Sequence, residues 1–350
     1  MLYKLFSSGH KNEYDRNTSD YNRNAENYNR EGKEKDRKKS VFSSLLNKSK
    51  DAEPRAQRQG FFSRIFSAPL PFDDASITWC ANFLIVEKDI LVRILRNTSA
   101  CYSHFKLGKR SGGYRTISAP EPILRNIQKT IYMRILQSVN LHSASMGFRQ
   151  SISVVNNAAP HLGRGELLKV DIADFFGSIK KIRVIKAFEK IGYPANISRV
   201  LAELCVLDGK LPQGAPSSPA LSNIIAYDMD VALASLAQKY NLTYTRYADD
   251  LTFSGDNIAS DSVLSEIRNV VSAEKFVLQR KKTRLLTEKK RKIVTGISIS
   301  SGDKLTIPRA KKREIRKNVH FILTKGLVGH QRAIGSTDPS YMKRLLGYLN

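Results

Sequence analysis

Apolar residues recur at helical spacing in the first ordered-looking part of the chain, which begins near residues 69–71. Across residues 74–96 they include Leu84, Ile90, Leu91 and Leu95, and this spacing predicts helical structure. Residues 105–117 contain two strand-like pieces around a basic, glycine-containing turn, which predicts a hairpin. A further helix is predicted for residues 123–140.

The rest of the chain alternates between short β-rich runs and longer amphipathic stretches. Residues 167–172 are almost entirely apolar, which predicts a buried central strand. Ser222 or Asn223 is predicted to cap a helix that reaches Lys239. The remaining expected elements are helices at 180–191, 197–207 and 260–274, a hairpin of strands 242–247 and 251–254, a strand at 293–299, and a strongly basic helix at 308–324.

Residues 1–70 differ in amino-acid composition from the rest of the chain. Residues 17–30 are rich in Asn, Tyr and Arg, and residues 31–39 are almost all charged. Few aliphatic side chains are available for burial, so we predict a basic, disordered extension. An aromatic and basic cluster at residues 61–66 would serve either as a local packing anchor or as a docking element for RNA or a partner.

The charge balance narrows the class of partner. The chain has 58 Lys and Arg against 32 Asp and Glu, a net charge of +26, which favours a polyanion such as nucleic acid. Charge alone also allows a ribosomal-type or membrane-surface protein. Cys80, Cys101 and Cys205 are too few and too scattered for a disulfide framework or a zinc site. No apolar run approaches membrane-spanning length, so we expect a cytoplasmic protein without a membrane partner.

Candidate chemistry is concentrated in three acids. Asp249 and Asp250 are adjacent at the predicted hairpin turn, and neighbouring carboxylates repel unless a cation lies between them. Oxygen ligands of this kind suit Mg²⁺. The alternative for this motif alone is an exposed acidic turn. Asp171 lies near the end of the apolar strand and needs a partner there, such as a metal or an Arg, because an unpaired buried carboxylate is costly.

Two loops complete the candidate site. Lys109, Arg110 and Arg115 in the basic glycine hairpin are suited to gripping a triphosphate, although a solvated basic hairpin would look the same. A rigid Pro- and Gly-rich loop at residues 211–219 carries one amide, that of Gln213. Two-metal phosphoryl transfer requires acids that bind two metal ions and cationic residues that neutralise a triphosphate. The candidate residues meet both requirements.

The order and the amino-acid sequences of these segments closely resemble the motifs of reverse transcriptases over about residues 72–350. Besides the basic hairpin, the matching segments are Val170-Asp-Ile-Ala-Asp-Phe-Phe176, Leu211-Pro-Gln-Gly-Ala-Pro-Ser-Ser-Pro-Ala-Leu-Ser-Asn223, Tyr247-Ala-Asp-Asp250 and Gln279-Arg-Lys-Lys-Thr283. Two shorter markers, Asn157-Ala-Ala-Pro-His161 and Val294-Thr-Gly296, resemble those of the bacterial retron group.

The resemblance implies a role for each matching residue. Asp171, Asp249 and Asp250 fall on the catalytic aspartates, with Asp171 and Asp249 expected to bridge two Mg²⁺ ions. Lys109 or Arg110, with Arg115, would contact the incoming triphosphate, and Gln213 would position the nucleotide. Phe176 would lie under the sugar and exclude ribonucleotides; ordinary core packing is its alternative. Lys282 would protonate pyrophosphate, unless the adjacent Lys281 does so.

Further implied roles concern nucleic acid. Asn157 and His161 would serve the RNA or its path, although a core or helix-cap histidine is an equally open interpretation of His161. Val294, Thr295 and Gly296 would lie near the primer end. The basic helix, with Arg309, Lys312, Arg313 and Arg316, would be a thumb that reads a template RNA stem.

The implied fold is α+β with a right-hand polymerase architecture of fingers, an antiparallel palm sheet and a helical thumb. Its expected divisions are an extension at 1–70, fingers and N-terminal helices at 71–165, a palm at 166–305 with a fingers insertion at about 180–215, and a thumb at 306–350.

The implied function is RNA-directed DNA synthesis from dNTPs. In the retron group a 2′-hydroxyl of a dedicated non-coding RNA primes synthesis, and the product is a branched multicopy single-stranded DNA (msDNA) kept in a nucleoprotein complex for phage defence. The chain ends close behind the thumb, so we expect a separate effector or toxin protein. The alternatives are another defence-associated or diversity-generating reverse transcriptase, or mainly a nucleoprotein scaffold that restrains an effector.

Overall fold

The computed structural model describes residues 70–347, apart from residues 110–111, 257, 259–260, 288–289, 337 and 339. The extension predicted for residues 1–70 therefore lies outside the described residues, except for Leu70, and so does the cluster at residues 61–66.

The helical structure predicted for residues 74–96 is confirmed, and it is divided into two helices, α3 (Asp74–Leu84) and α4 (Lys88–Arg96). The Asp73 side chain caps the start of α3 by accepting a hydrogen bond from the Ser76 amide. Ile85 then adopts a left-handed conformation with φ 53°, and its amide donates to carbonyls of the last turn. Apolar periodicity does not register such a break, because both helices bury residues on the same core.

The predicted basic hairpin is present as β1 (Tyr102–Gly108) and β2 (Tyr114–Pro120), paired antiparallel after the 3₁₀ turn η2 (Ser99–Cys101). Gly112 and Gly113 both have positive φ in its turn. The following helix is shorter than predicted. α5 (Pro122–Arg134) ends where Ile135 leaves helical geometry, and a 3₁₀ turn, η3 (Leu136–Ser138), follows.

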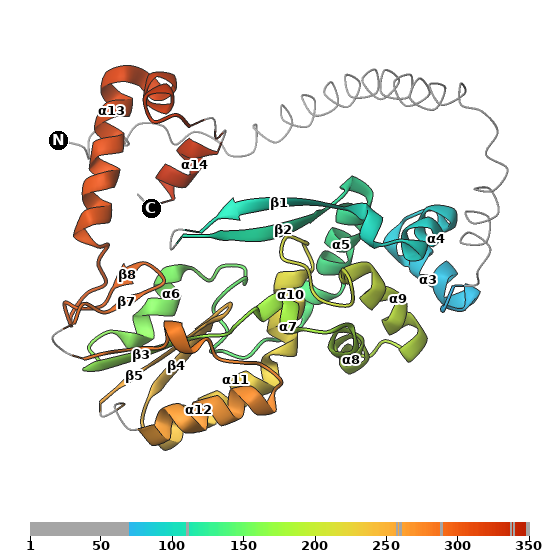
Figure 1. Ribbon diagram of the computed structural model, residues 1–350, viewed down its shortest axis with the longest axis horizontal. Coiled ribbons are helices and arrows are strands. Elements are labelled where there is room, and N and C mark those ends of the chain that lie inside the picture. Colours follow the sequence, from blue (N-terminus) through green and yellow to red (C-terminus); the bar gives the residue numbers. More distant parts are fainter. Residues whose placement is uncertain are drawn as a thin grey trace, which may run out of the picture. The chain divides into compact units, whose positions relative to one another are not determined.

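A four-stranded antiparallel sheet carries the centre of the protein, with strand order β4-β5-β3-β6. Its members are β3 (Glu166–Asp171), β4 (Thr243–Tyr247), β5 (Asp250–Gly255) and β6 (Arg284–Leu286). Alternate side chains, including Val170, Leu251 and Phe253, enter the main hydrophobic core. Helices α11 (Tyr227–Lys239) and α12 (Asp261–Ala273) cover one face of this sheet (Figure 1).

Four helices lie between β3 and α11 in the chain: α7 (Phe175–Ser178), α8 (Lys181–Ile191), α9 (Ala195–Cys205) and α10 (Ser218–Ile225). The prediction that Ser222 or Asn223 caps a single helix is wrong. Both residues are buried inside α10, which begins at Ser218 with a proline in its first turn, and the chain bends at Ala226 before α11. Their polar side chains have buried partners, which a capping rule does not anticipate.

A second, smaller core lies on the other face of the sheet. It combines α6 (Val154–Ala158), the 3₁₀ turn η4 (Ala159–His161) and the hairpin β7 (Ile293–Val294) with β8 (Ile297–Ser298). Ala158, Leu167, Val294 and Ile299 are its buried members. The single strand predicted for residues 293–299 is wrong, because Thr295 (φ 44°) and Gly296 (φ 91°) make a two-residue hairpin turn.

The C-terminal part is helical, as the sequence predicted. α13 (Arg309–Ala333) extends beyond the predicted end at residue 324, with non-helical geometry at Gly326, and α14 (Tyr341–Leu346) follows. His330 and Tyr341 join the two helices through a 2.7 Å hydrogen bond. All three cysteines are free.

Within the part of the chain that the structure describes, no single helix has the length and apolar character to cross a membrane. The bent pair α10 and α11 meets those two criteria only when its helices are taken together.

Candidate active site

The three predicted acids meet at one end of the central sheet. Asp171, the last residue of β3, lies directly opposite Asp250, the first residue of β5. Asp249 precedes it in the turn from β4, and its carbonyl accepts a 2.9 Å hydrogen bond from the amide of Ile172. The backbone therefore brings together three carboxylates that are distant or adjacent in the sequence.

The turn that carries the paired aspartates is tightly constrained. Ala248 has φ 57°, a left-handed conformation that non-glycine residues rarely adopt. Gly147 packs against it so closely that a Cβ atom there would lie 2.7 Å from the Ala248 amide nitrogen. Gly147 is a site residue that sequence reasoning missed, since its need for a hydrogen side chain arises only from this contact.

Beneath the turn lies a buried ion pair that the sequence analysis also missed. The fully buried guanidinium of Arg246 donates two 2.7 Å hydrogen bonds to Asp230 of α11. Its Nη1 donates to the Ala248 carbonyl and to Asn223, whose own amide donates to the Gly147 carbonyl. Charge-assisted bonds of this kind are strong when fully satisfied, so the network holds the strained turn in place. The sequence feature that could have indicated this ion pair is Arg246 itself, a charged residue within a β-rich run.

Crowded carboxylates perturb one another electrostatically. Burial, followed by the charges of Asp171 and Asp250, raises the pKa of Asp249 to about 6. Burial also raises the pKa of Asp250. Lys282 opposes this repulsion: its ammonium donates hydrogen bonds of 2.9 and 2.8 Å to the two carboxylate oxygens of Asp171, which raise the pKa of the lysine. The partner that the sequence required for Asp171 is thus a lysine.

The donor set fits Mg²⁺ chemically. No group of three metal-binding side chains stands ready-arranged among the described residues. Mg²⁺ does not need one, because it binds through one or two carboxylates and completes its shell with water and substrate phosphate. The carboxylates repel one another, and the pKa values of Asp249 and Asp250 are raised. The Lys282 ammonium offsets part of this negative charge at Asp171. A divalent cation bound between the carboxylates would stabilise their ionised forms.

Aromatic side chains lie beside the acids. Phe176 is half-buried, with its ring 5.6 Å from that of Phe175 and 6.1 Å from that of Phe148. Phe148 in turn lies 6.5 Å from Tyr247, the residue before Ala248. Sequence reasoning found Phe176 and missed Phe148, which belongs to a loop without a recognisable motif.

The loops expected to hold the nucleotide are joined to each other. The Gln213 carbonyl accepts a 2.8 Å hydrogen bond from the Ser118 amide of β2, and Gly214 packs so closely on Ser118 that a Cβ would not fit. Arg115 is exposed on β2, and Lys109 closes the hairpin turn with its amide. Arg110 lies outside the described residues. Lys281 lies beside Lys282 in the 3₁₀ turn η5 (Arg280–Lys282) and is exposed.

Asn157 and His161 are buried. His161 bridges the sheet through bonds of 2.6 Å to Ser254 and 2.8 Å to Thr245, and burial lowers its pKa to about 4. The amide of Asn157 donates to the Thr295 hydroxyl, which anchors α6 to the turn between β7 and β8. Val294 is a core residue and Gly296 provides the turn. These contacts support indirect roles, by positioning of neighbouring elements.

The cations predicted for the thumb are on the surface of α13. Arg309, Lys312, Arg313 and Arg316 are exposed, whereas Ile315 is buried. The predicted basic surface therefore exists at the first turns of this helix.

A helix-covered antiparallel sheet whose strand ends gather three carboxylates fits metal-assisted phosphoryl transfer, the chemistry of nucleic-acid polymerases and nucleases. The reverse transcriptase (RNA-dependent DNA polymerase) family model matches residues 107–317. The Retron Ec86 reverse transcriptase of Escherichia coli is 36% identical over 67% of this chain and 76% of its own length. Retron Mx65 and Mx162 reverse transcriptases of Myxococcus xanthus are 34% and 32% identical, over 63% and 64% of this chain.

The chain spans only about half the length of these two Myxococcus relatives, 55% and 53%. A solved telomerase from Candida albicans shares 11% identity, with a TM-score of 0.42 over 64% of this chain and 50% of the telomerase. The chain belongs to the reverse transcriptase family, as an RNA-directed DNA polymerase of the bacterial retron type. Its fold is accordingly the expected right-hand α+β polymerase.

Proposed function

We propose that this protein copies a dedicated non-coding RNA into DNA, starting from a 2′-hydroxyl of that RNA, and retains the branched single-stranded product in a complex that serves phage defence. Support comes from the retron relatives and from a basic chain whose exposed cations on α13 suit a structured RNA. An effector protein would act on or through this complex.

Three regions would divide the work, as the sequence indicated: fingers over residues 71–165, a palm over 166–305 with an insertion at about 180–215, and a thumb over 306–350. The palm assignment is supported by the central sheet and its carboxylates. The thumb assignment is supported by the exposed basic side of α13.

In this proposal Asp171 and Asp249 hold two Mg²⁺ ions, whose chemistry is to activate the attacking hydroxyl and to neutralise charge on the leaving pyrophosphate. Asp250 contributes its carboxylate from the opposite strand. Lys282 is a proton donor to pyrophosphate, and its proximity to Asp171 supports this role. Lys109 or Arg110, with Arg115, would bind the triphosphate from the basic glycine hairpin.

Nucleotide selection would rest on Phe176 and Gln213. Phe176 lies next to the strand end that carries Asp171, so a ring at this place is suited to exclude a 2′-hydroxyl sterically. The bond between Gln213 and β2 supports a nucleotide pocket assembled from both loops. Asn157, His161 and residues 294–296 would hold the elements along the nucleic-acid path.

The observation that carries the proposal is the meeting of Asp171, Asp249 and Asp250 at one sheet end in a chain of retron type. The test is to extract nucleic acid from the purified protein and to run it on a denaturing gel after RNase, DNase and debranching treatments. A single short DNA whose mobility shifts on debranching is expected. Unbranched DNA would favour another class of bacterial reverse transcriptase.

The exposed basic helix also supports a scaffold role, in which the protein mainly holds a finished RNA–DNA molecule. The double variant Asp249→Asn with Asp250→Asn separates the two functions. It should abolish DNA synthesis and leave RNA binding intact, because α13 is unchanged. Loss of RNA binding in this variant would contradict the separation, and undiminished synthesis would contradict the catalytic assignment.

A further inference from the structure

A loop beside the active site holds an aromatic ring at the surface in a strained conformation. Phe148 has φ 60° and Ser151 has φ 61°, and the Phe148 side chain is 42% exposed. A bulky residue in this region of backbone conformation is uncommon, and such strain is frequently found at functional sites. The ring packs against other aromatic rings on one side, yet the residue keeps a large part of its surface open to solvent.

The loop is anchored on both sides of Phe148. The Met146 amide donates a 2.7 Å hydrogen bond to the Arg246 carbonyl, and Asn223 of α10 donates to the Gly147 carbonyl. On the far side, Nη1 of Arg149 donates to the carbonyls of His142 and Ser145. These contacts fix Phe148 next to Phe176 and Tyr247, which flank the catalytic carboxylates.

Phe148 also forms one wall of a hollow of about 280 Å³ that no assigned role uses. Its apolar lining includes the buried side chains of Leu136 and Ala220. Its polar lining is rich in amides, with Gln137, Asn140 and Gln150 all exposed at the surface. Gln137 donates a 3.2 Å hydrogen bond to Gln150, which leaves the terminal NH₂ group of Gln150 with its two N–H donors. Arg149 adds a guanidinium that has further N–H groups beyond Nη1.

This lining matches a sugar–phosphate unit. The volume is at the small end for a ligand site, which suits one ribose with its phosphate. Amides can donate to and accept from a hydroxyl, and Arg binds phosphate oxygens. The 2′-hydroxyl, both a donor and an acceptor, is the group by which a protein distinguishes RNA from DNA.

We propose that the hollow beside Phe148 binds a ribose–phosphate of the RNA template close to the nascent base pair, and that its amides read the 2′-hydroxyl. The Phe148 ring packs against the sugar and separates this subsite from the nucleotide site at Phe176. The inference rests on the proposed function, because it assigns to the same polymerase its preference for RNA as template.

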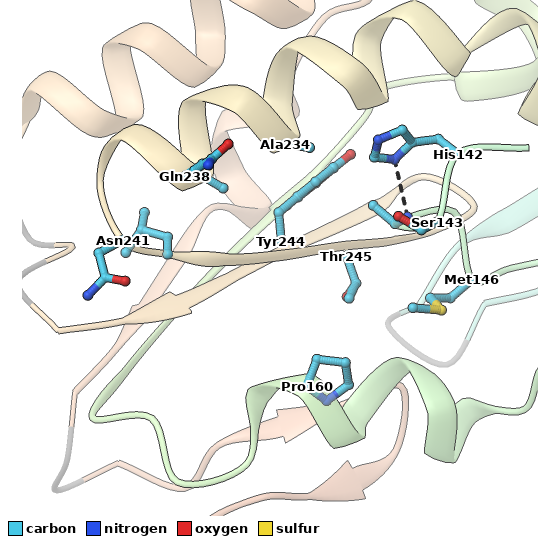
Figure 2. Close-up of a pocket in the computed structure, with 12 residues that line it drawn as sticks. His142, Ser143, Met146, Pro160, Ala234, Gln238, Asn241, Tyr244 and Thr245 are labelled. Atoms are coloured by element: carbon cyan, nitrogen blue, oxygen red, sulfur yellow. Dashed lines mark hydrogen bonds between the residues drawn. The ribbon is translucent and has the colours of Figure 1, made fainter.

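A second hollow provides the control. It measures about 410 Å³ and lies against α11 and β4, lined among others by Gln238, Asn241, Tyr244 and Pro160 (Figure 2). Gln238 presents the same amide chemistry, but its hollow includes none of the aromatic residues that flank the carboxylates. Gln238→Leu is therefore matched to Gln150→Leu in chemistry and differs in place.

The experiment measures kcat/KM for extension of a DNA primer on RNA templates that carry a single 2′-deoxy substitution, moved one position at a time through the first nucleotides of the duplex. The wild-type and Gln238→Leu proteins should show one position at which the substitution lowers kcat/KM roughly three- to tenfold, the range of one or two lost hydrogen bonds. In Gln150→Leu the penalty at that position should fall below about twofold.

Phe148→Gly gives an independent arm, because glycine accepts the left-handed backbone while the ring is removed. It should reduce the same penalty. A wild-type profile without a sensitive position, or an equal penalty in wild type and in both variants, would overturn the inference. Failure of the wild type to extend a primer on any RNA template would instead overturn the proposed function.

Discussion

The ammonium nitrogen of Lys282 lies within 2.9 Å of both carboxylate oxygens of Asp171, although 111 residues separate them in the chain. The contact is possible because the Gln279 amide donates a 2.7 Å hydrogen bond to the Asp171 carbonyl, which fixes the 3₁₀ turn η5 against the end of β3. Of the two adjacent lysines, Lys282 is the one whose hydrogen bonds to Asp171 the structure shows, and its action on pyrophosphate stays a prediction.

Replacement of Lys282 by Ala should therefore lower the rate of DNA synthesis by about 10²-fold, the usual scale of a lost general acid. The Lys281→Ala variant is the matched control, and its rate should stay within about threefold of wild type because Lys282, rather than Lys281, provides the hydrogen bonds to Asp171. Single-turnover incorporation of one dNTP measures both. Equal losses in the two variants would contradict the assignment of Lys282.

Removal of the Phe176 ring should weaken discrimination against ribonucleotides. Phe176→Ala is expected to raise the ratio of ribonucleotide to deoxynucleotide incorporation by roughly tenfold or more, because a steric clash with the 2′-hydroxyl is relieved. The carboxylates are unaltered, so dNTP incorporation should persist. Phe321→Ala on α13 removes a ring elsewhere and should leave the ratio unchanged. Unaltered discrimination in Phe176→Ala would place the sugar gate at another residue.

His161 should make the stability of the fold depend on pH. Its pKa is lowered to about 4 in the folded protein, first by burial and then by Arg164, whereas an unfolded histidine has a pKa of about 6.5. Between these values the unfolded chain binds more protons, so the free energy of unfolding falls as pH falls from about 6.5 towards 4. Between pH 7 and pH 5 this one group should lower the free energy of unfolding by on the order of 2 kcal/mol.

Urea unfolding at pH 7 and pH 5 measures this dependence. In His161→Gln, an amide of similar reach replaces the ring and does not titrate, so the loss of stability between the two pH values should be smaller than in wild type. An identical pH dependence in the two proteins would show that His161 is not the group responsible.

The exposed cations of α13 should set the salt dependence of RNA binding. Replacement of Arg309, Lys312, Arg313 and Arg316 by Ala removes up to four phosphate contacts, so the slope of log K against log salt should fall by up to about 3. A variant with Ala at Lys129, Lys186, Lys190 and Lys239 removes the same charge from α5, α8 and α11. Filter binding over a range of salt compares them. Equal slopes in the two variants would exclude α13 as the main RNA surface.

Short motifs were sufficient to find the three acids that meet at the end of the central sheet and most elements around them. The apolar strand that ends in Asp171 and the β-rich runs on both sides of Asp249 and Asp250 are local patterns, and local patterns survive without knowledge of the fold. The sequence did not predict the ends of helices and strands at places where the backbone conformation of one or two residues decided them. Ile85 ended a helix in an apolar run, and Thr295 with Gly296 turned a predicted strand into a hairpin.

What the sequence determined by itself was the class of chemistry, because carboxylates, a basic glycine turn and a Pro- and Gly-rich loop in this order are encoded residue by residue. Tertiary structure alone decided which groups support that chemistry. Arg246 pairs with Asp230, Gly147 leaves room for Ala248, and Phe148 reaches Phe176, and each pair joins segments distant in the chain. The physical reason is that burial and close contact depend on how helices and strands pack against one another. The spacing of residues along the chain does not specify which surfaces will meet.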